Sequence, residues 1–439
     1  MVPRRGDRAA VAAQLKQEKD RMRKAAMTLE SPERIQSMWE AASTQMRERR
    51  HPDDFPALPD MPAARYTSEV FYELEKKHLW SKTWLLVGLA HEFEGAGSYR
   101  TYTLNDAPVV VMRGRDDELR AFHNVCQHRG SLLMKDEGGT ARNMRCLYHC
   151  WTYDLDGKLL FVPDEHYFSG LDKADRGLKP IRCEQFGSLV FVNFDDEAEP
   201  LMEYLTDIPT LWADIPLNDL RLFERFSFEV DCNWKCVQDN FAENYHAKYV
   251  HEHTIDKVID SKTSALQMIR GGHNAIVIKS RGTLTSGMGA AFFKSDSDTA
   301  EEQASKLAEI SRSGQRSYNV FPNATFPIAE YLFPIVMVWP IEPGRCRVEV
   351  SFVKTGSGPD NEKLDQDTLT FFRSFIGEDL DALSGMHKAL AHGGIDSIPL
   401  CWSEQFIYNH EQHIDTVIGR ENIPDGLAVV EVDLPYANS

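Results

Sequence analysis

Apolar residues recur at two different periods along this chain, and the change of period divides it. Within residues 31–50 they fall on one side of a helix: Ile35, Met38, Trp39, Ala42 and Met46. Ser31 and Pro32 just before them are typical of a helix start. The prolines that follow at positions 52, 56, 59 and 62 favour a stiff, extended connector. The pattern therefore predicts that residues 1–64 form an N-terminal helical arm and a Pro-rich linker.

Beyond a helix expected to begin near Thr67, the apolar residues gather in short runs with the composition of β-strands. We expect strands over residues 83–88, 109–112, 119–125 and 189–194. Turn-forming residues such as those at 114–117 separate them. This pattern predicts a small antiparallel β domain over residues 65–200.

The second half of the chain mixes long helices with longer strands. Strand-like runs cover residues 222–230, 275–279, 335–341 and 346–354. Asp231 or Asn233 can cap a helix that follows the first of these runs. A long helical pattern covers residues 361–391. We therefore expect an α+β fold, with a larger second domain over residues 201–439.

Composition narrows the classes of function. The 439 residues are 42% hydrophobic, which is enough for two domain cores, and the formal net charge is −18. An acidic chain of this kind is not expected to bind nucleic acid or anionic membranes. The apolar run at 332–341 is too short to span a bilayer, and the first residues are polar. The 8 cysteines are scattered, so we expect a cytoplasmic protein with reduced thiols.

Candidate metal ligands occur first as two Cys-His pairs, Cys126-x-His128 and Cys146-x2-His149. Four such ligands could hold one tetrahedral zinc ion. They could equally hold a two-iron cluster, with both thiolates on one iron and both imidazoles on the other. The number of ligands alone leaves both possibilities open.

A second group of candidate ligands lies in the predicted helix after Asn233. Glu243 and His246 would be one turn apart on the same side of that helix, and His251 follows His246 by five positions. An opened final turn could bring the two histidines together. The spacing alone is a weak signal, because histidine takes many other roles.

The neighbours of both groups resemble one family. Arg129, Gly130, Tyr148, Trp151 and the 154–157 turn around the first group resemble the Rieske family. The second group resembles the mononuclear iron segment of Rieske oxygenase large subunits, in a set of matching residues: Asn233, Trp234, Lys235, Asp239, Asn240, Phe241, Glu243, Tyr245, His246 and His251. The resemblance covers roughly residues 65–390, with specificity in the two motifs.

The resemblance implies a fold and two cofactors. It implies a small β Rieske domain that holds a [2Fe-2S] cluster through Cys126, His128, Cys146 and His149. It also implies a catalytic domain like a helix grip, in which an antiparallel sheet holds long helices and a mononuclear Fe(II).

The resemblance further implies how the iron site is completed. His246 and His251 would share the iron with a later carboxylate, for which we choose Asp379, with Asp381 in reserve. Glu243 matches the acid that links an iron histidine to a cluster histidine of the neighbouring subunit. A head-to-tail homotrimer follows, because such a contact must close into a ring. Asn240 and Phe241 are the expected pocket residues.

The function implied is that of the terminal component of a multicomponent oxygenase. It would use dioxygen to hydroxylate an aromatic or other small organic substrate, as a mono- or dioxygenase. The chain has no convincing dinucleotide-binding fingerprint, so electrons should come from a separate NAD(P)H reductase or ferredoxin. A small β subunit is left open.

Rival interpretations remain at this stage. A zinc protein and an electron-transfer-only Rieske protein are alternatives from other classes. Within the oxygenases, N-demethylation of a quaternary ammonium compound competes with aromatic hydroxylation, because a Glu at the position of Glu243 also occurs in that branch.

Four remaining motifs receive structural interpretations. We expect Cys150, where the family usually has a small residue, to be a packed thiol and no ligand. Cys232-x3-Cys236 should be core packing, and His410-x2-His413 should lie on a surface helix. Residues 283–315, with Gly287-x-Gly289, could be a flap over the substrate entrance or a surface insert.

Overall fold

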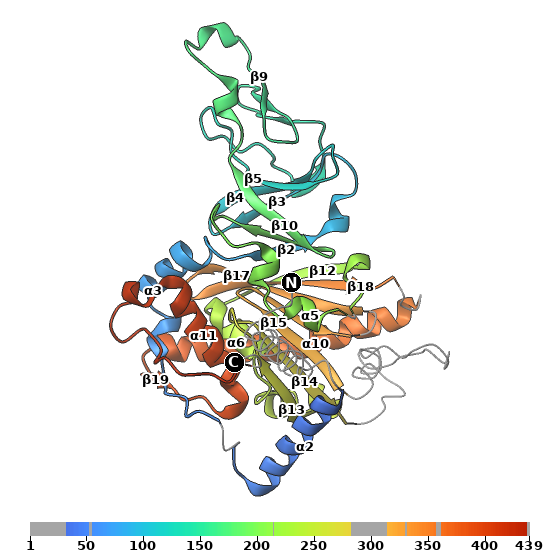
Figure 1. Ribbon diagram of the computed structural model, residues 1–439, viewed down its shortest axis with the longest axis vertical. Coiled ribbons are helices and arrows are strands. Elements are labelled where there is room, and N and C mark those ends of the chain that lie inside the picture. The colour runs from blue at the N-terminus through green and yellow to red at the C-terminus, as the bar shows by residue number, and fades with distance from the viewer. Residues whose placement is uncertain are drawn as a thin grey trace, which may run out of the picture.

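The computed structural model describes residues 32–51, 55–213, 215–281, 314–329, 332–356 and 361–436 (Figure 1). The segment before residue 32 and the predicted flap around Gly287-x-Gly289 lie outside the described residues. Over the part of the chain that is described, no helix combines the length and the apolar composition that a membrane crossing requires.

The first domain is built on a seven-stranded antiparallel sheet in the order β2-β11-β10-β5-β4-β3-β6. Its strands are β2 (Leu85–Leu89), β3 (Ser98–Leu104), β4 (Ala107–Arg113), β5 (Leu119–His123), β6 (Gly138–Thr140), β10 (Pro180–Phe186) and β11 (Leu189–Asn193). A second, three-stranded sheet contains β7 (Met144–Arg145), β8 (Thr152–Tyr153) and β9 (Leu159–Phe161). The four predicted strands are present, with ends that differ by up to two residues.

The second domain has a larger antiparallel sheet in the order β12-β18-β17-β16-β15-β14-β13. Its strands are β12 (Arg221–Val230), β13 (Ile259–Met268), β14 (Asn274–Ser280), β15 (Gly314–Val320), β16 (Ala324–Ile328), β17 (Leu332–Glu342) and β18 (Arg345–Lys354). The predicted α+β class, with a small antiparallel domain beside a larger one, is confirmed.

The helices gather around the larger sheet, as Figure 1 shows for α6, α10 and α11. Among the described residues the α-helices are α2 (Pro32–Glu48), α3 (Glu69–Leu74), α4 (Leu201–Tyr204), α5 (Ile208–Leu211), α6 (Trp234–Phe241), α7 (Ala247–Val250), α10 (Glu362–Ala391) and α11 (Gln405–Ile418). A π-helical turn, Glu75–Leu79, follows α3, and the short strands β1 (Met61–Pro62) and β19 (Ser397–Ile398) pair with each other.

The predicted arm helix, α2, is docked on the second domain. It packs against β13, and its Trp39 is buried. The Trp39 indole donates a hydrogen bond to the backbone oxygen of Val277 at 2.9 Å. The N-terminal helix therefore belongs to the core of the larger domain, although it precedes the smaller domain in the chain.

One helix prediction was wrong in its extent. Asn233 does cap α6, accepting a hydrogen bond from the Lys235 backbone N–H at 3.0 Å. However, α6 ends at Phe241, so Glu243 and His246 do not share one continuous helix. His246 instead lies just before the single turn of α7, and His251 lies just after it.

The prediction that His410 lies on a surface helix was also wrong. His410 is buried in α11, and its ring packs near Trp234 and Phe321. Burial lowers the pKa of His410 to about 4. The i, i+3 spacing of His410 and His413 gave no sign of this, because α11 contacts its neighbours on several sides.

A buried ionic network holds α6 and α11 to the chain near residue 65. The Arg65 guanidinium donates to Glu411 at 2.8 Å and to Asp415 at 2.6 Å, and Lys235 pairs with Glu75 at 2.6 Å. All five side chains are buried. Charges that are paired in this way tolerate burial, whereas removal of one partner would leave an uncompensated charge.

Candidate metal centres

The two Cys-His pairs lie on two loops of the same design. The backbone N–H of Cys126 donates to the Ser131 oxygen at 2.9 Å, and the Gly130 N–H donates back to the Cys126 oxygen at 3.0 Å. In the second loop Cys146 N–H donates to Trp151 at 2.9 Å, and Cys150 N–H donates back to Cys146 at 3.0 Å. Each thiol is thus placed by a closed turn of backbone.

The likeness of the two turns explains why the family usually has a small residue at the position of Cys150. Gly130 and Cys150 occupy the same position in the two turns, and both have a positive φ, +74° and +59°. A left-handed backbone favours glycine. Cys150 is only half-buried, so the expected packed thiol is only partly packed.

The four side chains divide by exposure. The thiols of Cys126 and Cys146 belong to a small separate core, whereas His128 and His149 are partly exposed. The imidazole centroids lie 4.7 Å apart. His128 also stacks on Trp151 at 4.8 Å with an interplanar angle of 7°. The thiols therefore lie inside and the imidazoles lie outside, as the two ends of a two-iron cluster require.

Two further details concern a bound cluster. The Nδ1 atom of His128 is buried and has no hydrogen-bond partner among the described residues, which fits an atom reserved for a metal. Tyr153 Oη accepts from Gln127 N–H at 2.9 Å and lies 3.4 Å from Cys126 Sγ. The Tyr153 hydroxyl can therefore donate its own hydrogen bond to Cys126 Sγ. Burial and this contact raise the pKa of Tyr153.

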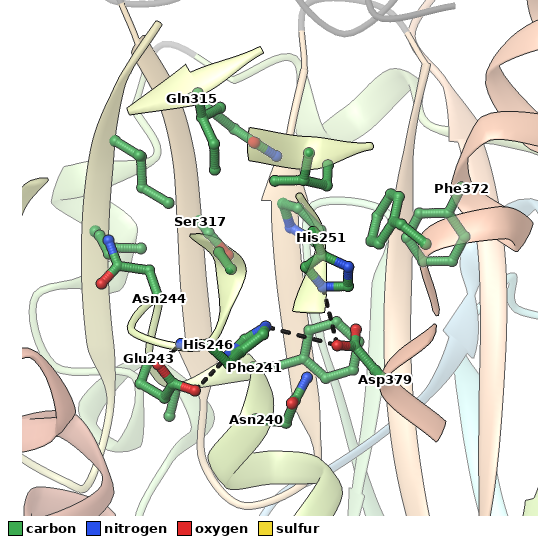
Figure 2. Close-up of a pocket in the computed structure, with 18 residues that line it drawn as sticks. Asn240, Phe241, Glu243, Asn244, His246, His251, Gln315, Ser317, Phe372 and Asp379 are labelled. Atoms are coloured by element: carbon green, nitrogen blue, oxygen red, sulfur yellow. Dashed lines mark hydrogen bonds and ion pairs between the residues drawn. The ribbon is translucent and has the colours of Figure 1, made fainter. Parts of the chain in front are cut away.

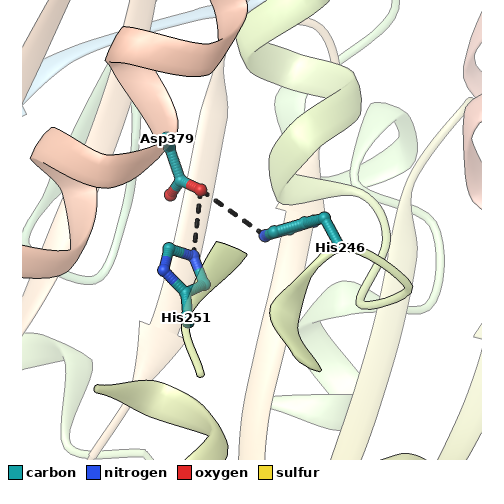
Figure 3. Close-up of side chains that lie close together, drawn as sticks. All are labelled: His246, His251 and Asp379. Atoms are coloured by element: carbon teal, nitrogen blue, oxygen red, sulfur yellow. Dashed lines mark ion pairs between the residues drawn. The ribbon is translucent and has the colours of Figure 1, made fainter. Parts of the chain in front are cut away.

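His246, His251 and Asp379 form the second centre (Figure 3). Their donor atoms lie within 4.8 Å of one another. Asp379 Oδ1 is 2.9 Å from Nε2 of His251 and 3.6 Å from Nε2 of His246. This oxygen lies within ion-pair distance of both imidazoles, although it makes no hydrogen bond of good geometry within the described structure. Two ring nitrogens and one carboxylate oxygen that converge in this way fit a shared metal ion.

A carboxylate holds the other nitrogen of each imidazole. Glu243 contacts Nδ1 of His246 and also accepts the His246 backbone N–H at 3.2 Å. Glu378 accepts from Nδ1 of His251 at 2.7 Å and from the Thr254 hydroxyl at 2.9 Å. Carboxylates in this position fix the tautomer and the direction of a metal-binding imidazole.

The electrostatics of His251 follow from these contacts. Burial alone would lower its pKa, but the carboxylates of Asp379 and Glu378 outweigh burial and raise the pKa of His251. Sequence reasoning found Glu378 only as part of an acidic pair and missed its contact with His251. The adjacency of Glu378 and Asp379 was visible, whereas the partner of Glu378 depends on tertiary packing.

The structure separates the two candidate third ligands. Asp379 is 3% exposed and points toward the histidines from α10. Asp381 is exposed and does not belong to a metal-ligating group among the described residues. The geometry therefore favours Asp379.

A mostly apolar cavity reaches the histidines and Asp379 (Figure 2). Its apolar lining comes from the sheet, α10, the end of α6 and the segment that follows α6: Phe241, Ala242, Ala247, Ile255, Ile259, Ile276, Ile278, Pro327, Phe372 and Phe375. Asn240, Asn244, Gln315 and Ser317 supply its uncharged polar groups. The two expected pocket residues, Asn240 and Phe241, thus do line a cavity at the second centre.

A second group of donors, Asp239, His410 and Glu411, also converges within 4.8 Å. Asp239 accepts a hydrogen bond from Tyr66 Oη at 2.5 Å, and Glu411 pairs with Arg65. This group is the inner part of the ionic network described above, and we assign no metal to it.

Two family models match the chain. The one described as "Rieske [2Fe-2S] domain" matches residues 83–172, and the one described as "Ring hydroxylating alpha subunit (catalytic domain)" matches residues 217–420. The first match contains both Cys-His loops, and the second contains all three residues of the second centre.

Curated relatives match about half of the chain. The oxygenase subunit of carnitine monooxygenase from Acinetobacter pittii is 34% identical over 213 residues, which are 47% of this chain and 57% of that protein. The alpha subunit of 2-aminobenzenesulfonate 2,3-dioxygenase from an Alcaligenes species is 34% identical over 217 residues, with 48% and 55% covered. The chain thus matches a little over half the length of these relatives.

Solved structures are similar over more of the chain. A quaternary ammonium Rieske monooxygenase superposes with a TM-score of 0.71 at 23% identity, covering 84% of this chain and 98% of that one. Naphthalene 1,2-dioxygenase from a Rhodococcus species gives a TM-score of 0.70 at 20% identity, with 89% and 99% covered. At these identities the likeness shows the fold.

Proposed function

Because the chain belongs to the Rieske oxygenase large-subunit family, we infer that it is the terminal oxygenase component of a multicomponent system. It would hydroxylate an aromatic or other small organic substrate with dioxygen. One observation carries this proposal: two imidazoles and a buried carboxylate converge at an apolar cavity, in the same chain as a Rieske domain.

The family defines the cofactors, and we assign their ligands. Rieske domains bind a [2Fe-2S] cluster and the catalytic domain binds a mononuclear iron, which removes the zinc alternative. We assign the cluster to Cys126, Cys146, His128 and His149, and the division of inner thiols and outer imidazoles supports this.

We assign the mononuclear iron to His246, His251 and Asp379. The convergence of Asp379 Oδ1 with two inward-facing ring nitrogens supports the assignment. Three protein ligands would leave other positions on the iron open. An electron-transfer-only protein would not need this centre or its cavity.

The chain's own residues would prepare the site for chemistry. When bound, the iron activates dioxygen with electrons that the cluster supplies one at a time. Glu243 and Glu378 hold the two imidazoles in one orientation. Phe241 and the isoleucines exclude water from the cavity, and Asn240 offers a polar group beside the centre.

We further propose a head-to-tail homotrimer in which electrons cross between subunits through Glu243. Strand β9 lies at the far end of the small domain, away from α6 and α10 (Figure 1). Large apolar side chains are exposed near the cluster loops, at Leu147 and Tyr148, and near the iron site, at Tyr245 and Tyr249. Such exposed patches mark interaction surfaces, and a contact between two different patches closes into a ring.

We also propose the electron donors, the location of the protein and its domain boundaries. Electrons would come from a ferredoxin or an NAD(P)H reductase, the protein would be cytoplasmic, and the trimer could also bind a small β subunit. We also propose domain boundaries at 64/65 and 200/201. The second family match begins at residue 217, within the proposed catalytic domain.

Oxidative N-demethylation of a quaternary ammonium compound is the second candidate. The relative from Acinetobacter pittii is a carnitine monooxygenase subunit, and three phenylalanines of the described residues line the cavity here. Aromatic faces can bind a quaternary ammonium cation.

The proposal is tested by isotope incorporation. Purified holoprotein would receive electrons from a ferredoxin and reductase pair under ¹⁸O₂, with neutral aromatics and quaternary amines as substrates. We expect ¹⁸O in a hydroxylated ring product. Formaldehyde from a quaternary amine would favour the second candidate, and reduction of the cluster without oxygen incorporation into any compound would contradict an oxygenase.

A further inference from the structure

The polar side chains of the substrate cavity are concentrated on one strand. Gln315 and Ser317 lie two residues apart on β15, so both point to the same face of the sheet. Their cross-strand neighbours are Ile278 and Ile276 on β14. All four residues line the cavity, so a polar stripe on β15 lies beside an apolar stripe on β14.

These two polar side chains are not used to hold the fold. Neither the Gln315 amide nor the Ser317 hydroxyl has a hydrogen-bond partner among the described residues, and both side chains are partly buried. By contrast, Asn244 in the same lining donates to the Ser261 backbone oxygen at 2.7 Å. A partly buried polar group that is left free at a cavity wall is available to a ligand.

The positions of Gln315 and Ser317 along the cavity follow from the geometry of β15. Asn319, the next residue on this face, donates to the backbone oxygen of Phe241 at 3.2 Å, in the segment that carries His246. Two residues of a strand span about 7 Å, so Ser317 lies about 7 Å and Gln315 about 13 Å along β15 from Asn319. Figure 2 shows Gln315 and Ser317 along the cavity from His246 and Asp379.

The charges of the lining restrict the substrate further. No lysine or arginine lines the cavity within the described part of the chain. The two carboxylates in the lining, Glu243 and Asp379, are occupied by the histidines. An anionic substituent would therefore lose its hydration without gaining a cationic partner, whereas a neutral amide or hydroxyl group could pair with Gln315 or Ser317.

We propose that Gln315 and Ser317 bind a neutral hydrogen-bonding substituent of an otherwise apolar substrate, at the end remote from the carbon that is oxidised. The substrate class is thus an uncharged, ring-sized molecule with an amide, carbonyl or hydroxyl group. This inference rests on the proposed function in one respect, because only an oxygenase would make the bound molecule its substrate. The binding site itself can be tested without any reaction.

Four probes of similar shape test it: naphthalene, 2-naphthamide, 2-naphthoate and trimethyl(2-naphthyl)ammonium. Their binding to the holoprotein would be measured by calorimetry without dioxygen. We expect 2-naphthamide to bind most tightly. Gln315→Leu and Ser317→Ala should each weaken 2-naphthamide binding by three- to tenfold, as expected for one neutral hydrogen bond, and should not weaken naphthalene binding. Gln366→Leu, at an exposed position on α10, is the matched control.

The result would overturn the proposal if 2-naphthoate or the ammonium compound bound more tightly than 2-naphthamide, if no probe bound, or if both variants bound 2-naphthamide as the wild type does. Oxygenation is measured separately on the same samples. A protein that shows the expected binding pattern but oxygenates nothing would contradict the proposed function and leave this site in place.

Discussion

The two candidate metal centres are built in opposite ways. All four cluster residues lie between positions 126 and 149, on two loops that backbone hydrogen bonds close. The proposed iron ligands come from both ends of α7 and from α10, more than a hundred positions later, and the partly buried carboxylates of Glu243 and Glu378 hold the two imidazoles. One centre is thus a local structure with its own small core, and the other is assembled by the packing of the larger domain.

This difference predicts that each centre can be lost without the other. Asp379→Ala should abolish turnover and iron binding at the second centre, because two imidazoles alone hold iron weakly. The visible spectrum of the cluster should be retained. Metal analysis and absorbance on the same sample check both outcomes.

Asp381→Ala is the control for this variant, because Asp381 is an exposed neighbour on the same helix. It should keep both metals and full turnover. Loss of iron from Asp381→Ala, with retention in Asp379→Ala, would reverse the choice of ligand.

Glu378→Gln should give a smaller, graded effect that is confined to the assembled centre. The amide keeps the shape but weakens the hold on His251 Nδ1, so iron affinity should fall by about 10- to 100-fold. Iron titration of the apoprotein measures this. An unchanged affinity would mean that the packing of His251 against Phe375, and not Glu378, orients the ring.

The burial of His273 in the larger domain should also make the stability of that domain fall at acidic pH. This side chain is fully buried and neutral, since it accepts from the Phe321 N–H at 3.0 Å and contacts the Tyr204 oxygen at 2.9 Å. Burial lowers its pKa to about 4. The unfolded chain, with a histidine pKa of about 6.5, binds more protons, so this contribution is present above pH 6.5 and is lost as the pH falls toward 4.

The full contribution of His273 to this pH dependence is about 3 kcal/mol in the free energy of unfolding. Burial raises the pKa of Asp239, so this group changes the free energy of unfolding with pH in the opposite direction. The difference between wild type and His273→Gln therefore isolates the histidine. Denaturant unfolding at pH 7 and pH 5 should show a shallower loss of stability in the variant, and His253→Gln, at an exposed position, should behave as the wild type. Parallel curves for all three would contradict the assignment.

The smallest effect is expected in the local centre. Cys150→Gly should stabilise the second cluster loop by up to about 1 kcal/mol, because glycine accepts the left-handed backbone without strain. The cluster spectrum should not change. The rate at which the cluster bleaches in denaturant is the measurement, and a lost or shifted spectrum would show that Cys150 takes part in binding.

The same contrast explains what the sequence could predict. The cluster residues follow from two motifs, since local loops carry the whole site, and the α+β class follows from the periodicity. Asp379 was proposed because the Glu378-Asp379 pair resembles an acidic pair of the family, whereas the contact of Glu378 with His251 depends on how α10 packs. The burial of His410 and the early end of α6 at Phe241 were missed for the same reason, because tertiary contacts decide them.

A single turnover would test the central claim most directly, namely that the two centres act together to oxygenate a substrate. Reduced protein would be mixed rapidly with ¹⁸O₂ and a panel of neutral aromatics, aromatic acids and quaternary amines. Cluster reoxidation would be followed by absorbance and products by mass, for wild type and His246→Ala. We predict a labelled product and fast reoxidation in the wild type only. Equal labelled product from His246→Ala, or none from the wild type with any compound, would contradict the account.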